Sequence, residues 1–304
     1  MSARAVAYVN LTLAMIIVGS SAVAGSVMVA VFPVHLASLL RFGLACLILL
    51  PLVRWKEGGL PRLSLRTHAL LLFQALCGSY LFTVLFLNGL KLTSPASAGI
   101  ITSSTPACIA AIGWIFLGER PGRRVLGGIA CCMAGVMTLN LAGGAAGAGA
   151  AGARDAPDAA GALLGNLLVL GAVFFESLFL LLRKGIREPL SSLSASMLVS
   201  VYGFALFLPL GVVEAAGFDF SAAGAGSWLA VGYYGAFVTV LAYLFWFTGI
   251  VRAPATVAGL FTGVMPVSAV TLAVLVLGEP LRWQQLAGCC GVLAGIALLY
   301  VRKR

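Results

Sequence analysis

The chain repeats its own sequence once, at a fixed spacing, inside an almost continuously apolar sequence. Residues 94–139 form two apolar segments joined by a short basic turn, and residues 254–299 follow the same pattern around a second Leu-Gly-Glu turn. With residue 89 aligned on residue 249, and with no gap, these residues meet an identical one in the second copy: Gly89, Ala98, Gly99, Thr102, Pro106, Leu117, Gly118, Glu119, Leu126, Gly128, Ala134, Gly135 and Leu139. A fixed repeat in a hydrophobic chain is typical of a duplicated membrane protein.

The composition indicates that lipid is the main solvent of this chain. Of its 304 residues, 61% are hydrophobic and only 9% are charged, whereas soluble domains carry about 25% charged residues. So few charges cannot cover a soluble surface of this size, and a lipid bilayer is therefore the first partner that the sequence predicts.

Ten apolar segments follow one another, and each is long enough to cross a hydrocarbon core of about 30 Å. They lie near residues 6–31, 33–53, 68–90, 94–117, 125–141, 162–182, 190–213, 227–250, 254–277 and 284–301. We predict an all-α membrane protein with ten transmembrane helices in two five-helix repeats, 1–141 and 162–304. The Ala/Gly-rich residues 142–161 are expected to form a flexible linker between the repeats.

Lysine and arginine predict the orientation. With the N-terminus in the cytoplasm, 15 of them lie at inner ends of spans and 3 at outer ends. This bias predicts that both termini are cytoplasmic in a multi-pass inner-membrane protein. It also explains the net charge of +10 without a nucleic-acid partner. Because five is an odd number of spans, the second repeat must be inverted relative to the first.

The first apolar segment also resembles a signal peptide, since Arg4 precedes an apolar run and Ala22-Val23-Ala24 could be cleaved. Cleavage would leave nine spans and would break the pairing of the two repeats. We therefore expect this segment to be retained as a transmembrane helix.

Several motifs resemble the EamA type of the drug/metabolite transporter superfamily. They are the pair Arg41-Phe42, the turn Thr105-Pro106, the Leu-Gly-Glu ends at 117–119 and 277–279, and the Ala-Gly pairs at 134–135 and 294–295. The resemblance covers the whole chain. It implies a cavity lined by spans one to four and six to nine, with spans five and ten at the periphery. It also implies export of amino acids, including aromatic ones, or of related metabolites.

Two charged residues lie within predicted spans, where a charge costs roughly 2.5–3.5 kcal/mol on insertion scales. Glu176 is interpreted as a proton or cation site, because removal from water favours the neutral carboxylic acid; the alternative is a packing hydrogen bond. Arg41 is interpreted either as a clamp on a substrate carboxylate or as a tie between two helices.

Polar residues next to two equivalent prolines are candidates to line the site. Ser104 and Thr105 adjoin Pro106 in the fourth span, and Thr262 lies near Pro266 in the ninth. A proline inside a helix removes one backbone hydrogen bond and bends the helix, so both prolines are predicted hinges. Packing between helices would explain the same hydroxyl groups.

Aromatic and hydroxyl side chains on the third, seventh and eighth spans could bind an aromatic or cationic solute. The candidates are Tyr80, Thr83, Tyr202, Thr239, Tyr243 and Trp246. Tryptophans near span ends could instead be ordinary membrane-interface residues. His35, at the predicted outer rim, is expected to be solvated.

Small residues recur at every fourth position in the fifth and tenth spans: Gly127, Cys131, Gly135, Ala287, Gly291 and Gly295. Such faces allow close helix packing, either within one chain or across a homodimer. The seven cysteines all lie in apolar runs, so we expect them to pack and not to bind a metal.

The sequence thus favours a secondary active transporter that moves a small polar molecule by alternating access, with proton coupling and no cofactor. The chain lacks a zinc-protease HExxH motif, a Walker loop and a GxSxG elbow with a partner histidine, so we do not expect an enzyme. A channel is less favoured because nothing resembles a selectivity filter. The substrate alternatives are drug-like cations and nucleotide sugars.

Overall fold

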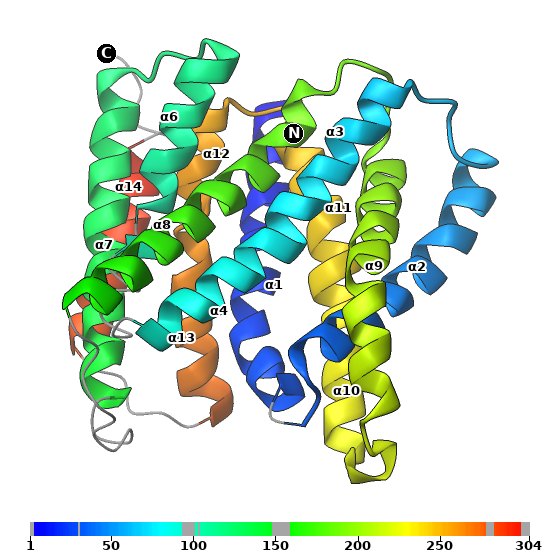
Figure 1. The fold of residues 1–304 in the computed structure, drawn as a ribbon. Coiled ribbons are helices and arrows are strands. Elements are labelled where there is room, and N and C mark those ends of the chain that lie inside the picture. The colour runs from blue at the N-terminus through cyan, green and yellow to red at the C-terminus, as the bar shows by residue number, and fades with distance from the viewer. Residues whose placement is uncertain are drawn as a thin grey trace. The chain divides into compact units, whose positions relative to one another are not determined.

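The computed structural model describes residues 3–29, 31–92, 101–102, 104–147, 159–277 and 283–298. All regular elements in these ranges are helices (Figure 1). In chain order they are α1 (Ala3–Val29), α2 (Val34–Glu57), α3 (Leu65–Ala75), η1 (Leu76–Leu81), α4 (Phe82–Leu92), α6 (Thr105–Leu117), α7 (Arg123–Gly147), α8 (Ala159–Leu182), η2 (Arg183–Gly185), α9 (Ser192–Ala216), η3 (Phe220–Ala222), α10 (Ala225–Tyr233), η4 (Tyr234–Leu241), α11 (Ala242–Ile250), α12 (Ala255–Phe261), α13 (Val264–Leu277) and α14 (Trp283–Ala297).

Seven stretches within these ranges are long and apolar enough to cross a membrane. They are Arg4–Ser21, Val34–Glu57, Leu65–Phe86, Leu163–Gly185, Ser192–Ala216, Ala225–Ile250 and Ala255–Leu272. The predicted all-helical membrane protein is therefore confirmed. The two ends of the predicted linker, residues 142–161, are helical in the structure, because α7 continues to Gly147 and α8 begins at Ala159. Residues 148–158 lie outside the described ranges.

The helices group into two compact units, and each unit contains helices from both predicted repeats. Unit 1 comprises Met1–Tyr80 and Leu182–Arg252, and unit 2 comprises Leu81–Leu181 and Ala253–Arg304. The chain passes from unit 1 to unit 2 inside η1, in the middle of the third span. The compact units are therefore not the repeats themselves.

In unit 1, α2 and α9 run antiparallel. The amide of Leu36, at the start of α2, donates a 2.8 Å hydrogen bond to Glu214 near the end of α9. At the other end of the pair, Glu57 of α2 accepts a 2.5 Å hydrogen bond from the Ser194 hydroxyl at the start of α9. Between these ends the helices contact along their length.

Also in unit 1, α1 runs antiparallel to the eighth span, which consists of α10, η4 and α11. Gly249 in α11 lies against Leu11, and a Cβ added to it would lie 2.7 Å from that side chain. Further along, the Ser20 and Tyr233 hydroxyls are 2.6 Å apart.

In unit 2, α6 runs antiparallel to α12, and α4 runs antiparallel to α8. Gly113 lies against Ala255, and Gly259 lies against Ile109. Residues Leu85–Leu92 of α4 approach Gly165–Gly171 of α8 in reverse order. The two helices of the second pair lie side by side in Figure 1.

These pairings are those that an inverted duplication requires. The pairs α2 with α9 and α7 with α14 each join helices at equivalent places in the two repeats, and α6 with α12 joins the second half of the fourth span to the first half of the ninth. Two copies in the same orientation would place equivalent neighbours parallel, whereas these pairs are antiparallel. The first span of each repeat also packs on the third span of the other repeat. This packing occurs once in each unit, as α1 against α11 and as α8 against α4.

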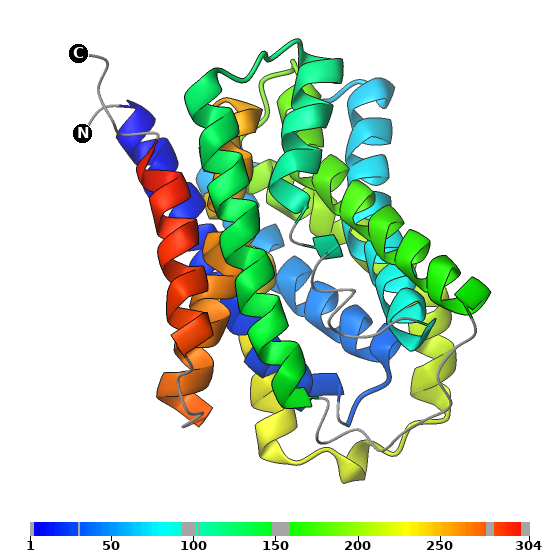
Figure 2. The same cartoon turned by 90° about the vertical axis from the view of Figure 1, so that its left-hand side faces the viewer.

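The small-residue faces of α7 and α14 pack against each other within this one chain (Figure 2). A Cβ on Gly135 would lie 2.6 Å from the Gly288 carbonyl oxygen, and one on Gly128 would lie 2.8 Å from that of Gly295. Of the predicted α7 face, Gly135 and Cys131 lie against Gly291 of α14, whereas Gly128 is packed in place of Gly127, which has nothing nearer than 4.0 Å. Of the two predicted alternatives, these contacts support packing within one chain.

The Leu-Gly-Glu turn after α6 connects the end of one helix to the start of another. Gly118 ends α6 with a φ of 68°, which favours glycine. The turn then places the Glu119 carboxylate at the start of α12, where it accepts hydrogen bonds from the amides of Ala255 (2.5 Å) and Thr256 (3.3 Å). A carboxylate at this position satisfies free N–H groups and complements the helix dipole.

Replacing Glu119 with alanine is expected to lower the free energy of unfolding by about 1–2 kcal/mol, the usual cost of losing a helix cap. Glutamine should cost less because its side-chain oxygen can still accept a hydrogen bond. Thermal unfolding in detergent would measure both variants, with exposed Arg120→Ala as a neighbouring control. Equal stability of Glu119→Ala and wild type would contradict the capping role.

Candidate functional site

In the described part of each unit, polar side chains gather around one ionisable residue inside a span, which is Arg41 in unit 1. The guanidinium carbon of Arg41 lies 4.4 Å from the centroid of the Phe42 ring and 5.0 Å from that of Tyr234. Tyr243 interacts with Arg41, with Tyr234 and with the Ser79 hydroxyl. We call Arg41, Ser79, Tyr234 and Tyr243 the Arg41 cluster; it brings together two residues predicted from the sequence and two that were not.

Two π-helical segments, η1 and η4, position this cluster. The residues of the second repeat that are equivalent to η1, residues 236–241, fall inside η4, so both repeats carry the feature at the same place. Ser79 belongs to η1, Tyr234 begins η4, and Tyr243 follows shortly after η4. A π-helix rotates the side chains after it and is frequent at functional sites. Sequence patterns did not reveal either segment.

The cluster in unit 2 surrounds Glu176 in α8. Its carboxyl group is hydrogen-bonded with the Thr105 hydroxyl, and Cys108 lies close to it. Cys108 is hydrogen-bonded with Ser177, whose hydroxyl donates to the Val173 carbonyl at 2.7 Å. We call Glu176, Thr105, Cys108 and Ser177 the Glu176 cluster. Glu176 and Thr105, which the sequence placed in different halves, are thus direct neighbours.

Glu176 differs from every other acidic residue in the described part of the chain. The others are bonded at helix ends: Glu57, Glu119, Glu188, Glu214 and Asp219. Glu176 lies inside a span instead, and part of its side chain is accessible. Its hydrogen-bond partner among the described residues is the Thr105 hydroxyl, at the start of α6. Asp155, Asp158 and Glu279 lie outside the described ranges.

The two prolines do not bend continuous helices, which corrects the predicted geometry. Pro106 lies in the first turn of α6, and Pro266 lies in the first turn of α13, just after the turn that ends α12. Proline is well tolerated there because the first N–H groups of a helix have no intrahelical partner. The helix ends beside both prolines still offer places to flex, and their role as hinges stays a prediction.

The hydroxyl groups beside these prolines bond to backbone carbonyls three residues earlier in the chain. Ser104 donates to the Ile101 carbonyl at 2.6 Å, and Thr262 donates to the Gly259 carbonyl at 2.6 Å. Thr105 additionally reaches another span, through its bond with Glu176. The hydroxyl groups of Ser104 and Thr262 are therefore explained by these local hydrogen bonds as well as by substrate binding.

The remaining predicted residues differ in accessibility. Thr239 is fully buried and donates to the Tyr234 carbonyl at 3.2 Å, and Trp246 is only 3% exposed. Tyr80 is half-buried, with its ring 5.7 Å from that of Phe207, and Thr83 is half-buried in unit 2. Thr239 and Trp246 therefore present almost no surface to a solute in this conformation.

Both histidines have partners that the sequence did not indicate. The Tyr202 hydroxyl lies 2.7 Å from Nδ1 of His68. His35, expected to be solvated, lies 2.6 Å from Glu214, which also accepts the Leu36 amide. Glu214 lies 179 residues from His35, so no local pattern could have predicted the pair.

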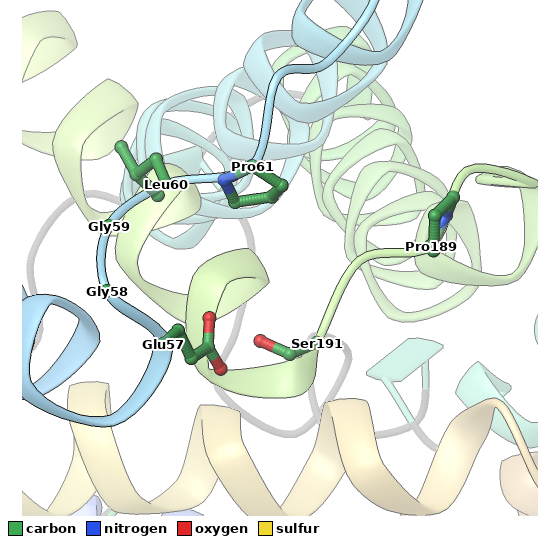
Figure 3. A pocket seen from close by; sticks show the side chains of 7 residues that line it. All are labelled: Glu57, Gly58, Gly59, Leu60, Pro61, Pro189 and Ser191. Atoms are coloured by element: carbon green, nitrogen blue, oxygen red, sulfur yellow. The ribbon is translucent and has the colours of Figure 1, made fainter.

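A separate pocket of about 370 Å³ lies at the loops that follow α2 and precede α9 in unit 1. Its lining residues are Glu57, Gly58, Gly59, Leu60, Pro61, Pro189 and Ser191. The Glu57 and Ser191 side chains point toward one another across it (Figure 3). None of the predicted site residues lines this pocket.

A pair of hydrogen bonds near this pocket connects the two loops. Glu188 accepts hydrogen bonds from the hydroxyl and the amide of Ser64, the residue before α3. These bonds hold the pKa of the exposed Glu188 carboxyl below its usual range. Glu188 therefore holds Ser64, whose own hydroxyl caps α3 by accepting a hydrogen bond from the Thr67 amide.

The fold defines the class of protein. A helical chain built from two antiparallel copies, with ionisable groups inside its spans, has the architecture of many membrane transporters. The chain belongs to the EamA-like transporter family, whose model matches residues 5–141 and again residues 163–301.

Two proteins of Bacillus subtilis (strain 168) are similar to this chain. The uncharacterized transporter YetK is 40% identical over 298 residues, which cover 98% of this chain and 88% of YetK. The uncharacterized transporter YyaM is 24% identical over 257 residues, which cover 84% of this chain and 81% of YyaM. A solved crystal structure shares the fold with a TM-score of 0.75 at 20% identity, covering 97% of this chain and 96% of that one.

Proposed function

We propose that this protein is a secondary active exporter of small metabolites, which exchanges a proton at Glu176 for its solute by alternating access. The observation that carries the proposal is that Glu176, alone among the described acidic residues, lies in the interior of a span, away from its ends. It contacts Thr105 at the start of α6, next to a helix end that could move. Acidic residues in such positions mark proton pathways in transporters.

The hydrogen atoms around Thr105 suggest how proton binding could act on the helix. The Thr105 hydroxyl donates its single hydrogen to the Thr102 carbonyl at 2.8 Å, yet it is also hydrogen-bonded with Glu176. A neutral Glu176 can donate its own proton to the Thr105 oxygen, and both bonds then form. An ionised Glu176 has no proton to donate and competes with Thr102 for the Thr105 hydrogen. Proton release would therefore loosen the start of α6.

The proposed solute is an amino acid, with aromatic amino acids as first candidates. The family resemblance and the rings near Arg41 support this choice. The proposed contacts are Arg41, Tyr80, Thr83, Ser104, Thr105, Tyr202, Tyr243 and Thr262, with hinges at Pro106 and Pro266. Export of drug-like cations or of nucleotide sugars is the alternative.

The proposal includes a topology. The repeats would span residues 1–141 and 162–304 around the linker 142–161, with both termini in the cytoplasm and the protein in the inner membrane. The excess of Lys and Arg at one set of span ends supports this orientation.

Transport by purified protein in proteoliposomes would test the function. We expect a pH gradient to drive accumulation of at least one amino acid from a panel of amino acids, organic cations and nucleotide sugars. Collapse of the gradient by a protonophore should stop accumulation but leave exchange of labelled for unlabelled solute. Accumulation that does not depend on the pH gradient would contradict proton exchange. Transport restricted to organic cations or nucleotide sugars would contradict the proposal that the solute is an amino acid.

A further inference from the structure

We propose that the Arg41 cluster binds the carboxylate of a ring-bearing organic acid and does not bind an ammonium group, so that the amino group of a substrate is dispensable. This inference rests on the proposed transport function and narrows the substrate class of the same site. It separates aromatic monocarboxylates and amino acids, which should both bind, from aromatic amines, which should not.

No acidic residue described in unit 1 balances the charge of Arg41. The four acids there are committed elsewhere: Glu57 to Ser194, Glu188 to Ser64, Glu214 to His35 and Leu36, and Asp219 to Ser221. A cation inside a span is costly without an anion nearby. A solute carboxylate would supply the missing charge.

The geometry of Arg41 also suits a carboxylate. The guanidinium carbon lies over the rings of Phe42 and Tyr234, both within the reach of a cation–π contact, about 6 Å. The N–H donors of a guanidinium lie in its plane and match the two oxygens of a carboxylate. Contact with the ring faces holds the guanidinium in place without a carboxylate partner, so its N–H donors can bind a ligand.

The cluster is accessible as well. Arg41, Tyr234 and Tyr243 are each only partly buried, although all three lie inside spans. The two tyrosines thus offer ring faces and hydroxyl groups beside the guanidinium. This combination suits a ligand with one anionic group and one ring.

The described cluster carries a single positive charge and no negative one. The residue of the second repeat that is equivalent to Arg41 is Val201, so that repeat supplies no matching guanidinium. One guanidinium suits a monoanion better than a phosphate dianion. Because the described cluster contains no carboxylate, it would repel an ammonium group instead of binding it.

Three indole compounds that differ mainly in their charged groups would test the inference: indole-3-acetate, tryptophan and tryptamine. Equilibrium binding of each radiolabelled compound to the full-length protein in nanodiscs at pH 7.5 needs no proton gradient. We expect indole-3-acetate and tryptophan to bind within about threefold of each other and tryptamine to bind at least about thirtyfold more weakly.

Variants at Arg41 make the test specific. Arg41→Gln should weaken binding of both acids by at least about thirtyfold. The affinity of Arg41→Lys should lie between those of Arg41→Gln and wild type, because lysine keeps the positive charge but cannot donate two parallel N–H bonds to a carboxylate. Arg54→Gln, at the exposed end of the same helix, is the matched control and should bind as wild type does. If Arg41→Gln fails to fold, Arg41→Lys and the three wild-type affinities still decide the question.

Several results would overturn the inference. They are binding of tryptophan without indole-3-acetate, equal binding of tryptamine, unchanged binding by a folded Arg41→Gln protein, and failure of all three compounds to bind. Proton exchange is judged separately, by the gradient-driven and exchange fluxes of Glu176→Gln, because the binding tests at Arg41 need no proton gradient. A wrong substrate class and a wrong coupling residue would therefore give different patterns.

Discussion

Glu176→Gln is expected to abolish proton-driven accumulation while exchange of labelled for unlabelled solute continues. Glutamine keeps the size and the hydrogen-bonding ability of glutamic acid, and its amide can still donate to the Thr105 oxygen. It cannot gain or lose a proton. We expect accumulation to fall by roughly a hundredfold or more, the effect typical of removing a proton-transfer group.

The measurement compares two fluxes in the same proteoliposome preparation, one driven by a pH gradient and one by exchange. Glu176→Asp should retain part of the accumulation, because it still titrates but its shorter side chain reaches Thr105 less well. Glu119→Gln is the matched control in the same unit, since Glu119 caps α12 and is not proposed to carry protons. Normal accumulation by Glu176→Gln would remove the proposed coupling site.

Gly135→Leu is expected to prevent stable folding, and Gly135→Ala to lower the free energy of unfolding by about 1–3 kcal/mol. A Cβ on Gly135 would meet the Gly288 carbonyl oxygen and the Val292 amide nitrogen, both at 2.6 Å. Backbone atoms of two packed helices cannot move aside as a flexible side chain can, so α7 and α14 would have to separate.

Gly127→Ala is the matched control, because the same helix offers that Cβ open space to 4.0 Å. It should be neutral or slightly stabilising, since alanine favours helices over glycine. Thermal unfolding, with size-exclusion chromatography for the oligomeric state, would compare the variants. A Gly135→Ala protein as stable as wild type would contradict the close packing of these helices within the chain.

The Leu-Gly-Glu repeat shows what a local pattern can and cannot predict. Its recurrence at 117–119 and 277–279 marked equivalent turns, and Gly118 does end α6 in a left-handed conformation. The partner of Glu119 is the start of α12, which lies 136 residues further along the chain. No periodicity at Glu119 carries information about a helix end so far away.

The predicted site was incomplete for the same reason. Arg41 and Glu176 could be identified from the sequence because a charge within an apolar run is conspicuous. Ser79 and Tyr234 could not, because they lie within two π-helical segments, whose side chains do not follow the regular α-helical period. That period favoured Tyr243, which belongs to the Arg41 cluster, but also Thr239 and Trp246, which are buried.

The sequence by itself determined that this protein is an all-helical, duplicated membrane protein with two ionisable groups inside its spans. Those properties depend on composition and on spacing along the chain. In lipid, the backbone N–H and C=O groups must be hydrogen-bonded within the chain, and an unpaired charge is costly. Only the tertiary structure decided the neighbours: Thr105 beside Glu176, Tyr234 beside Arg41, and α7 against α14. Such contacts join residues far apart in the chain, and they depend on which helix faces meet when an inverted copy packs against the original.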